Sequence, residues 1–126
     1  MDALTKLLIV EDSEADQFIA VRRVRRLYPD AEILLAADGQ EAIEILGTCR
    51  RLPDLILLDI NMPRMDGHEF LEHYYRNTSR EIPVVLMLTS SDQSEDRDKA
   101  ARFDCVRKYI VKPIDEKDLR GLPIAV

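Results

Sequence analysis

The sequence predicts an α/β domain in which helices cover both faces of a parallel sheet. Two observations support this prediction. Short apolar runs recur along the chain without polar alternation, which is typical of strands buried on both faces. The segments between them carry apolar residues at helical spacing, and strand–helix alternation of this kind indicates a doubly wound sheet. The five expected strands are residues 7–10, 33–36, 55–58, 83–88 and 109–111.

Length and charge limit the classes of protein to consider. A chain of 126 residues is expected to form one domain, residues 1–126, with no effector domain. Its net charge of −6 argues against binding to nucleic acid. No apolar run approaches membrane-spanning length and the Met1-Asp2 start lacks a leader pattern, so we expect a cytoplasmic protein with no membrane association. Cys49 and Cys105 have no CxxC neighbourhood and are expected to be reduced thiols.

The first expected strand ends in Glu11-Asp12, and a helix follows it. Ser13 is placed to cap this helix, which runs to about Tyr28, and Asp16 is favourable in its first turn. The apolar residues near one face are Phe18, Val21, Val24, Leu27 and Tyr28.

The other face of this helix carries several cationic side chains in an acidic chain. They are Arg22, Arg23, Arg25 and Arg26. Two interpretations remain open. The arginines form a solvated face near the helix C-terminus, where cations are favourable, or they form a docking surface for an acidic partner.

The third expected strand delivers an acid to the edge of the sheet. Asp38 caps a short helix over 39–46, with Gly47 as its C-terminal stop. The apolar run 55–58 then ends at Asp59. A residue at the carboxyl end of a central strand lies where ligand sites occur in open α/β sheets. Asn61 begins the turn that follows.

The second half of the chain repeats this pattern. Helices are expected over 68–77 and 94–103. The fourth strand ends in Thr89 and the fifth in Lys112. A short last helix begins after Asp115 and is ended by Gly121 and Pro123 within about two turns. The expected strand order is the flavodoxin-like 2-1-3-4-5, with a cleft between the first and third strands.

In this topology, the carboxyl ends of four strands meet at one edge of the sheet. They bring together Glu11, Asp12, Asp59, Thr89 and Lys112. Carboxylates placed this close raise one another's pKa, and a hard divalent cation such as Mg²⁺ relieves that repulsion. Acids directly after the first strand exclude an ordinary phosphate site at the helix N-terminus.

The chemistry of these side chains suggests roles for them. Asp59 is the candidate nucleophile, a carboxylate that forms an aspartyl phosphate. Mg²⁺ offsets charge on the transferred group, while the Thr89 hydroxyl and the Lys112 ammonium hold its other oxygens.

With these residues, the chain resembles the receiver domain of two-component response regulators, over essentially its whole length. The resemblance is to the stand-alone regulators of the chemotaxis type. The matching segments are 10–12 (VED), 37–39 (ADG), 58–67 (LDINMPRMDG), 88–91 (LTSS) and 109–113 (YIVKP).

The resemblance implies specific roles for individual residues. Asp59 would accept the phosphoryl group from a histidine kinase or a histidine phosphotransfer protein. Asp12, Asp59 and the Asn61 main-chain carbonyl would ligate Mg²⁺, with Glu11 acting through water. Thr89 would be the switch hydroxyl and Tyr109 the aromatic that turns inward with it. The Lys112–Pro113 bond would be cis.

The chain departs from the family pattern at two places, both on the surface that receivers of this type use to act on downstream proteins. The family's Gly-Ala pair before the fifth strand is replaced here by Asp104-Cys105-Val106. The last helix is short and is followed by the apolar tail 122–126. The identity of the downstream protein target and the formation of a homodimer therefore remain open.

Two other functions fit these residues less well. A pseudo-receiver that docks proteins without phosphorylation would lack one of the site residues, and none is missing. A dehalogenase-like phosphatase would have a second acid two residues after Asp59, where this chain has Asn61. We therefore expect a phosphorylation-dependent switch and no turnover enzyme.

Overall fold

The sheet has the predicted parallel topology. The computed structural model describes residues 6–62, 64–77, 84–89, 103 and 105–120. Its strand order is β2-β1-β3-β4-β5, which confirms the predicted order. All four strand pairings are parallel. The strands are β1 (Lys6–Val10), β2 (Glu32–Ala36), β3 (Leu55–Asp59), β4 (Val84–Thr89) and β5 (Val106–Val111).

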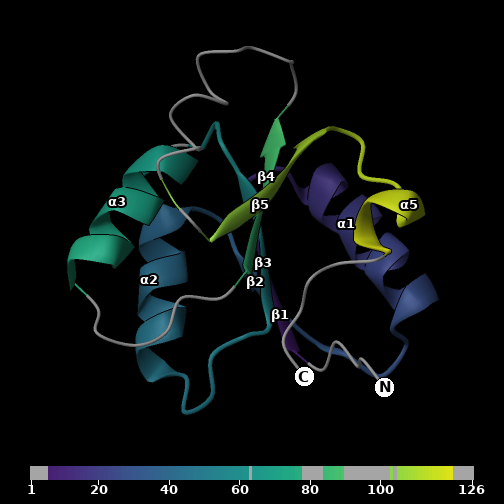
Figure 1. Ribbon diagram of the computed structural model, residues 1–126, viewed down its shortest axis with the longest axis horizontal. Coiled ribbons are helices and arrows are strands. Elements are labelled where there is room, and N and C mark those ends of the chain that lie inside the picture. Colours follow the sequence, from purple (N-terminus) through teal and green to yellow (C-terminus); the bar gives the residue numbers. More distant parts are fainter. Residues whose placement is uncertain (1–5, 63, 78–83, 90–102, 104, 121–126) are drawn as a thin grey trace.

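Helices cover both faces of this sheet. The described helices are α1 (Glu14–Leu27), α2 (Gly39–Thr48), α3 (Gly67–Asn77) and α5 (Glu116–Leu119). α1 and α5 lie on one face, and α2 and α3 lie on the other (Figure 1). No helix in the described part of the chain is both long and apolar enough to cross a membrane. The helix expected over 94–103 falls outside the described residues except for Phe103, and so does the apolar tail 122–126.

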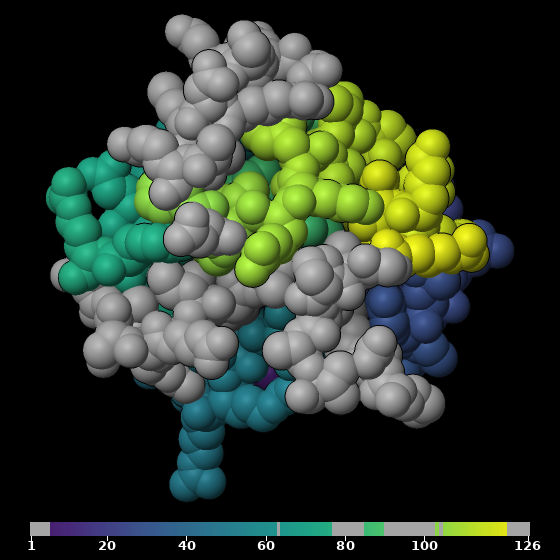
Figure 2. Space-filling view, viewed as in Figure 1, coloured from purple at the N-terminus to yellow at the C-terminus, as the bar shows by residue number. Residues whose placement is uncertain are grey.

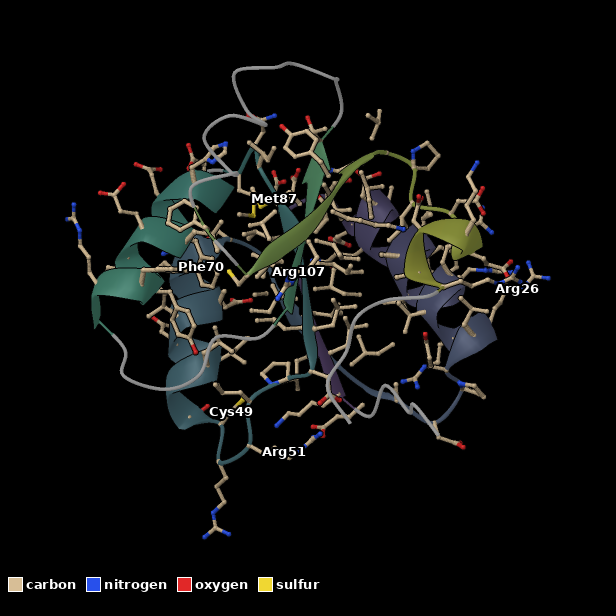
Figure 3. All side chains as sticks on the ribbon, in the orientation of Figure 1. Arg26, Cys49, Arg51, Phe70, Met87 and Arg107 are labelled. Carbon is tan, nitrogen blue, oxygen red and sulfur yellow. The ribbon has the colours of Figure 1, made fainter. Side chains whose placement is uncertain are left out.

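The core lies on both sides of the sheet because neighbouring strand residues point to opposite faces. On β1, Leu7 and Ile9 pack towards α1 and α5, while Leu8 and Val10 pack towards α2 and α3. Figure 3 shows Phe70 of α3 and Met87 of β4 between the sheet and its helices. Every residue of β3 is buried, which explains its unbroken apolar run.

The end of α2 differs from the prediction, whereas the short α5 agrees with it. α2 continues through Gly47 to Thr48, so the predicted stop at Gly47 is wrong. The Thr48 hydroxyl donates to the Ile45 carbonyl oxygen (2.9 Å), and this added bond helps the last turn to form. α5 is confirmed as a short helix, and it has only four residues, with Asp115 as its N-cap.

The prediction of which α1 residues face the sheet is partly wrong. Ala20 and Val24 are its buried residues, but Phe18 is 61% exposed. At about 100° per residue, Phe18 lies roughly 200° from Ala20 around the helix and so points away from the sheet. The Arg22 guanidinium lies 5.5 Å from the centre of the Phe18 ring, which is a cation–π distance.

Three of the four arginines on α1 bind other parts of the same chain. Arg23 donates to the Ile114 carbonyl oxygen (3.3 Å) and Arg25 to that of Ala31 (2.6 Å). Arg26 lies 3.6 Å from the Glu116 carboxylate of α5 (Figure 3). These contacts favour a structural role for the three residues, because they fasten α1 to its neighbours.

β5 forms an exposed edge of the sheet. Its surface continues into that of α5 on the face shown in Figure 2. Arg107 and Lys108 are exposed along this strand, and charged side chains at an open edge discourage pairing with a strand of another molecule.

Gly67 gives a first testable prediction. A Cβ at this position would lie 2.7 Å from the Asp59 carbonyl oxygen and 3.1 Å from the Ile60 Cα, both backbone atoms that cannot easily move. We therefore expect Gly67→Ala to lower the free energy of unfolding by about 2 kcal/mol. Urea denaturation followed by circular dichroism measures this change.

Gly47 provides the matched control. A Cβ there would meet no atom within 4 Å, and the residue lies inside α2. Gly47→Ala should raise stability by roughly 0.5–1 kcal/mol, because alanine has the higher helix propensity. Equal effects from the two substitutions would contradict the proposed clash at Gly67.

Candidate functional site

Three acids gather at the carboxyl edge of the sheet. Glu11 and Asp12 follow β1, and Asp59 ends β3. Each can offer a carboxylate oxygen such that all three oxygens lie within 4.8 Å of one another. Glu11 and Asp59 are buried, at 1% and 3% exposure, whereas Asp12 is exposed. The structure therefore brings together the acids that the sequence placed at this edge.

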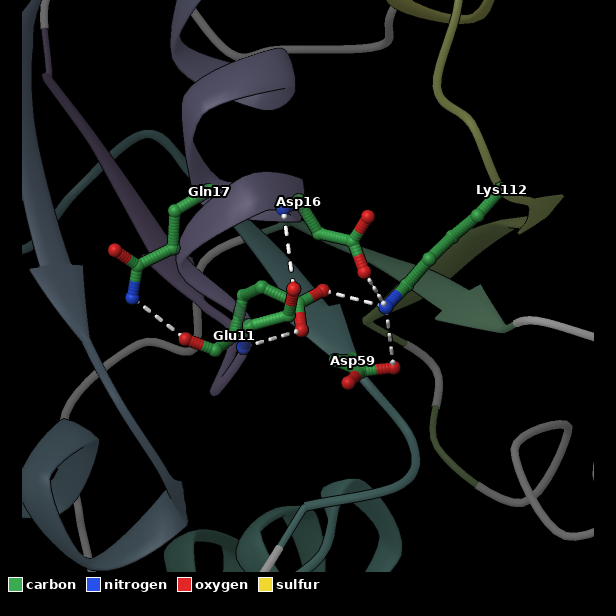
Figure 4. Close-up of polar contacts among 6 residues, drawn as sticks. Glu11, Asp16, Gln17, Asp59 and Lys112 are labelled. Atoms are coloured by element: carbon green, nitrogen blue, oxygen red, sulfur yellow. Dashed lines mark hydrogen bonds and ion pairs between the residues drawn. The ribbon is translucent and has the colours of Figure 1, made fainter.

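Lys112, directly after β5, completes the cluster. Its Nζ lies 2.6 Å from Glu11 Oε1 and 3.4 Å from Asp59 Oδ1 (Figure 4). The peptide bond between Lys112 and Pro113 is cis, as expected. The Lys112 backbone N–H donates to the Thr89 carbonyl oxygen (2.7 Å), which fixes the lysine beside the end of β4.

The first turn of α1 contributes contacts that sequence reasoning missed. Asp16 Oδ2 accepts a hydrogen bond from Lys112 Nζ (3.1 Å), and Gln17 Nε2 donates to the Glu11 carbonyl oxygen (2.6 Å). The Ser13 backbone N–H donates to Glu11 Oε2 (3.1 Å). The sequence explains Asp16 only as an acid that is favourable in the first turn of a helix. The same position, in the turn that follows Glu11, is the feature that could have indicated a contact with the site.

The two expected switch residues lie on neighbouring strands. Thr89 ends β4 and is fully buried. Tyr109 is half-buried on β5, opposite Met87 in the strand register, and packs against the core on the α2 and α3 side. Thr89 therefore lies at the carboxyl edge of the sheet. Tyr109 lies on the neighbouring strand, two register positions farther from that edge.

The loop after β3 is anchored at several points. Asn61, which is exposed, begins it. The Gly67 N–H donates to the Ile60 carbonyl oxygen (2.9 Å). Arg64 adopts a left-handed conformation (φ 65°) and its guanidinium lies 2.7 Å from Asp38 Oδ2. These contacts hold the backbone around Asn61 against the start of α2. Ser90 and Ser91 lie outside the described residues.

Burial changes the acidity of the clustered groups. Burial raises the pKa of Glu11 to about 7, although its hydrogen bond with Lys112 opposes this. Burial also raises the pKa of Asp59, against the opposing charge of Lys112. For Lys112, burial acts to lower the pKa, but the hydrogen bond with Glu11 and the charge of Asp59 outweigh it and raise the pKa.

These observations fit a divalent cation. The three acids supply hard oxygen ligands at compatible separations, which suits Mg²⁺. The raised pKa values of Glu11 and Asp59 show that one lysine does not offset the cost of burying both carboxylates. A cation at this position would supply the missing positive charge.

The Glu11 pKa predicts how stability depends on pH without metal. Unfolded glutamate loses its proton near 4.5, while Glu11 in the folded protein keeps it to about 7. The native state therefore binds more protons in this window, so the free energy of unfolding should fall as pH rises from about 4.5 to 7. Glu11 alone would contribute about 3 kcal/mol.

Urea denaturation in EDTA across this pH range tests the prediction. Glu11→Gln removes the titrating group and should make the loss of stability with rising pH smaller. Identical pH dependence in the two proteins would show that Glu11 does not titrate as described.

Comparison with known proteins gives consistent matches. The family model for the response regulator receiver domain matches residues 7–122. The probable methanogenesis regulatory protein FilR2 of Methanothrix harundinacea is 36% identical over 119 residues, which cover 90% of this chain and 76% of that protein. The Regulator of RpoS of Escherichia coli K12 is 38% identical over 117 residues, which cover 93% of this chain but only 32% of that longer protein.

Solved structures match over nearly the whole chain. A two component response regulator from Cytophaga hutchinsonii has a TM-score of 0.84 at 27% identity, covering 94% of this chain and 92% of that one. The Mn²⁺-bound form of response regulator Rcp1 has a TM-score of 0.78 at 27% identity, covering 97% and 99% of the two chains.

Proposed function

The chain belongs to the family of response regulator receiver domains, and we therefore propose that it is a signalling switch in which Asp59 accepts a phosphoryl group. Receiver domains of two-component systems take phosphoryl groups from histidine kinases and act on downstream targets. For this chain, we propose a histidine kinase or a histidine phosphotransfer protein as the donor.

One observation carries the proposal. The carboxylate of Asp59 is gathered with those of Glu11 and Asp12, and the Lys112 ammonium lies 3.4 Å from Asp59 Oδ1. A nucleophilic carboxylate with a cation-binding set on one side and an ammonium on the other suits transfer of an anionic group.

In the proposed step, a carboxylate oxygen of Asp59 attacks the phosphorus of the phosphohistidine donor. The new O–P bond forms as the donor's N–P bond breaks, and the donor nitrogen keeps the electron pair and takes up a proton. The Lys112 ammonium and the Thr89 hydroxyl then donate hydrogen bonds to the phosphoryl oxygens. Both groups are held at the ends of their strands by the contact between Lys112 N–H and the Thr89 carbonyl oxygen.

The acid cluster would bind Mg²⁺ in this protein. Asp12, Asp59 and the Asn61 main-chain carbonyl would hold the ion, with Glu11 acting through a water molecule. The bound ion would offset negative charge on the group being transferred. The fit of the three carboxylates and the Mn²⁺-bound form of the similar protein Rcp1 support this assignment.

We further propose that Thr89 and Tyr109 transmit the change. Thr89 would move towards the phosphoryl group, and the Tyr109 ring would fill the space that it leaves. Tyr109 lies on β5, whose residues Arg107, Lys108 and Val111 are exposed. The surfaces of β5 and α5 are continuous on the face shown in Figure 2. A downstream protein would recognise the altered packing on this side of the domain.

Incubation with acetyl phosphate, with Mg²⁺ or with EDTA, separates this proposal from its alternatives. A lasting adduct of one phosphoryl group that requires Mg²⁺, seen by intact-mass spectrometry, supports the switch. No adduct would support a docking module that works without phosphorylation. Continuous release of phosphate over many turnovers would identify a phosphatase.

A further inference from the structure

The Lys112 ammonium has one partner that the proposed phosphotransfer does not use. Its Nζ lies 2.6 Å from Glu11, 3.1 Å from Asp16 and 3.4 Å from Asp59 (Figure 4). The contact with Asp16 is a hydrogen bond, and the contacts with Glu11 and Asp59 are ion pairs. Only 16% of the Lys112 side chain is exposed, and water therefore contributes little to holding it.

The three partners differ in what happens to them when the site is used. Glu11 and Asp59 belong to the set proposed to bind the cation, and Asp59 also carries the phosphoryl group. Asp16 lies outside that set, on the first turn of α1, where its backbone N–H donates to Ser13 Oγ (3.3 Å). Its carboxylate remains available to Lys112 when the charges of the other two acids are engaged elsewhere.

We propose that Asp16 is a positioning residue: from α1, it competes with Glu11 and Asp59 for the Lys112 ammonium. In the metal-free protein it competes with Glu11 and Asp59 for the ammonium, so that these acids are held less tightly by Lys112 and are freer to bind a cation. After phosphorylation it competes with the phosphoryl oxygens for the same ammonium and limits how firmly Lys112 holds them. This role rests on the proposed function of Asp59.

The space beside Asp16 is small. A hollow of about 10 Å³, with room for about one water molecule, lies between α1 and the segment after β5, and Asp16 and Lys112 both line it. Ile19 and Ile114 form apolar parts of its wall. Because Lys112 Nζ already lies within 3.4 Å of all three carboxylates, a small shift of the side chain is enough to change which acid it contacts most closely.

Asp16→Asn removes the charge while keeping the shape of the side chain. Without Asp16, Lys112 should pair more tightly with Glu11 and Asp59, so the affinity for Mg²⁺ should fall about two- to fivefold. At saturating Mg²⁺, the affinity for beryllofluoride, used as a phosphoryl mimic, should rise about two- to fivefold. Isothermal titration calorimetry measures the first change, and a beryllofluoride titration followed by NMR measures the second.

Two further variants control for charge and folding. Glu14→Gln removes a negative charge from the same turn of α1, but Glu14 makes no contact with Lys112 within the described ranges. It should leave the beryllofluoride affinity unchanged. Asp16→Glu keeps the charge and should restore both affinities towards the wild-type values.

The opposite directions of the two changes identify the role of Asp16. A shift of both affinities in the same direction, or effects equal to those of Glu14→Gln, would overturn it. The Mg²⁺ titration needs no phosphoryl group, so it tests the role of Asp16 independently of the proposed function. If the proposed function is wrong, the wild-type protein itself would form no adduct with acetyl phosphate.

Discussion

Asp59→Asn should abolish phosphorylation by acetyl phosphate. The substitution keeps the shape of the side chain but replaces the attacking carboxylate with a carboxamide, which is a poor nucleophile. Position 59 lies at the buried end of β3, beside Leu88 of β4 in the register. No other carboxylate of the site ends a central strand in this way. Intact-mass spectrometry after incubation with Mg²⁺ and acetyl phosphate measures the adduct.

Loss of labelling in this variant would not result from unfolding. Burial raises the pKa of Asp59, so its charged form is unfavourable in the folded, metal-free protein. Asp59→Asn removes that charge and should be at least as stable as the wild type in urea denaturation with EDTA. Asp30→Asn, which changes an exposed acid outside the cluster, should label as fully as the wild type. An undiminished adduct in Asp59→Asn would contradict the assignment of the nucleophile.

Mg²⁺ should stabilise the folded protein strongly, and Asp12→Ala should remove most of this effect. The acid cluster exists only in the folded state, because its members come from separate strands. A ligand that binds only the folded state at 100 times its dissociation constant contributes about 2.7 kcal/mol. Asp12 offers one of the three clustered oxygens. Its loss should weaken binding enough that the melting temperature no longer rises over the same range of Mg²⁺ concentration.

The metal-free proteins provide a second comparison. In EDTA, Asp12→Ala should melt no lower than the wild type, because the substitution removes a negative charge from beside Asp59. Differential scanning fluorimetry with and without Mg²⁺ gives all four melting temperatures. Asp30→Asn should keep the full metal effect. Equal stabilisation of wild type and Asp12→Ala by Mg²⁺ would exclude Asp12 as a ligand.

Much of the fold follows from local sequence patterns. The unbroken apolar runs of β1 and β3 indicate a sheet that is covered on both faces. The helices between the strands indicate that the strands are parallel, because each helix carries the chain back to the same end of the sheet. Once that topology is fixed, the carboxyl end of every strand must lie at one edge. Asp59 and Lys112 could therefore be placed together from the sequence although they are far apart along the chain.

Other features depend on how the elements pack. The exposure of Phe18 follows from the rotation of α1 about its axis, which the sheet sets and apolar spacing alone did not reveal. Two of the four α1 arginines, Arg23 and Arg26, bind segments that come close only after folding. The extension of α2 past Gly47 similarly reflects hydrogen bonds that outweigh the low helix propensity of glycine.

For the site, the sequence by itself determined that Glu11, Asp12, Asp59 and Lys112 lie at the edge of the sheet, because strand ends and side-chain types are local properties. Only the tertiary structure decided how these charges pair. The bond between Lys112 and Asp16 joins residues 96 positions apart, and it depends on the approach of α1 to the end of β5. The raised pKa of Glu11 likewise depends on burial by several elements at once. Such energies arise from distance and exclusion of water, which are fixed only when the chain has folded.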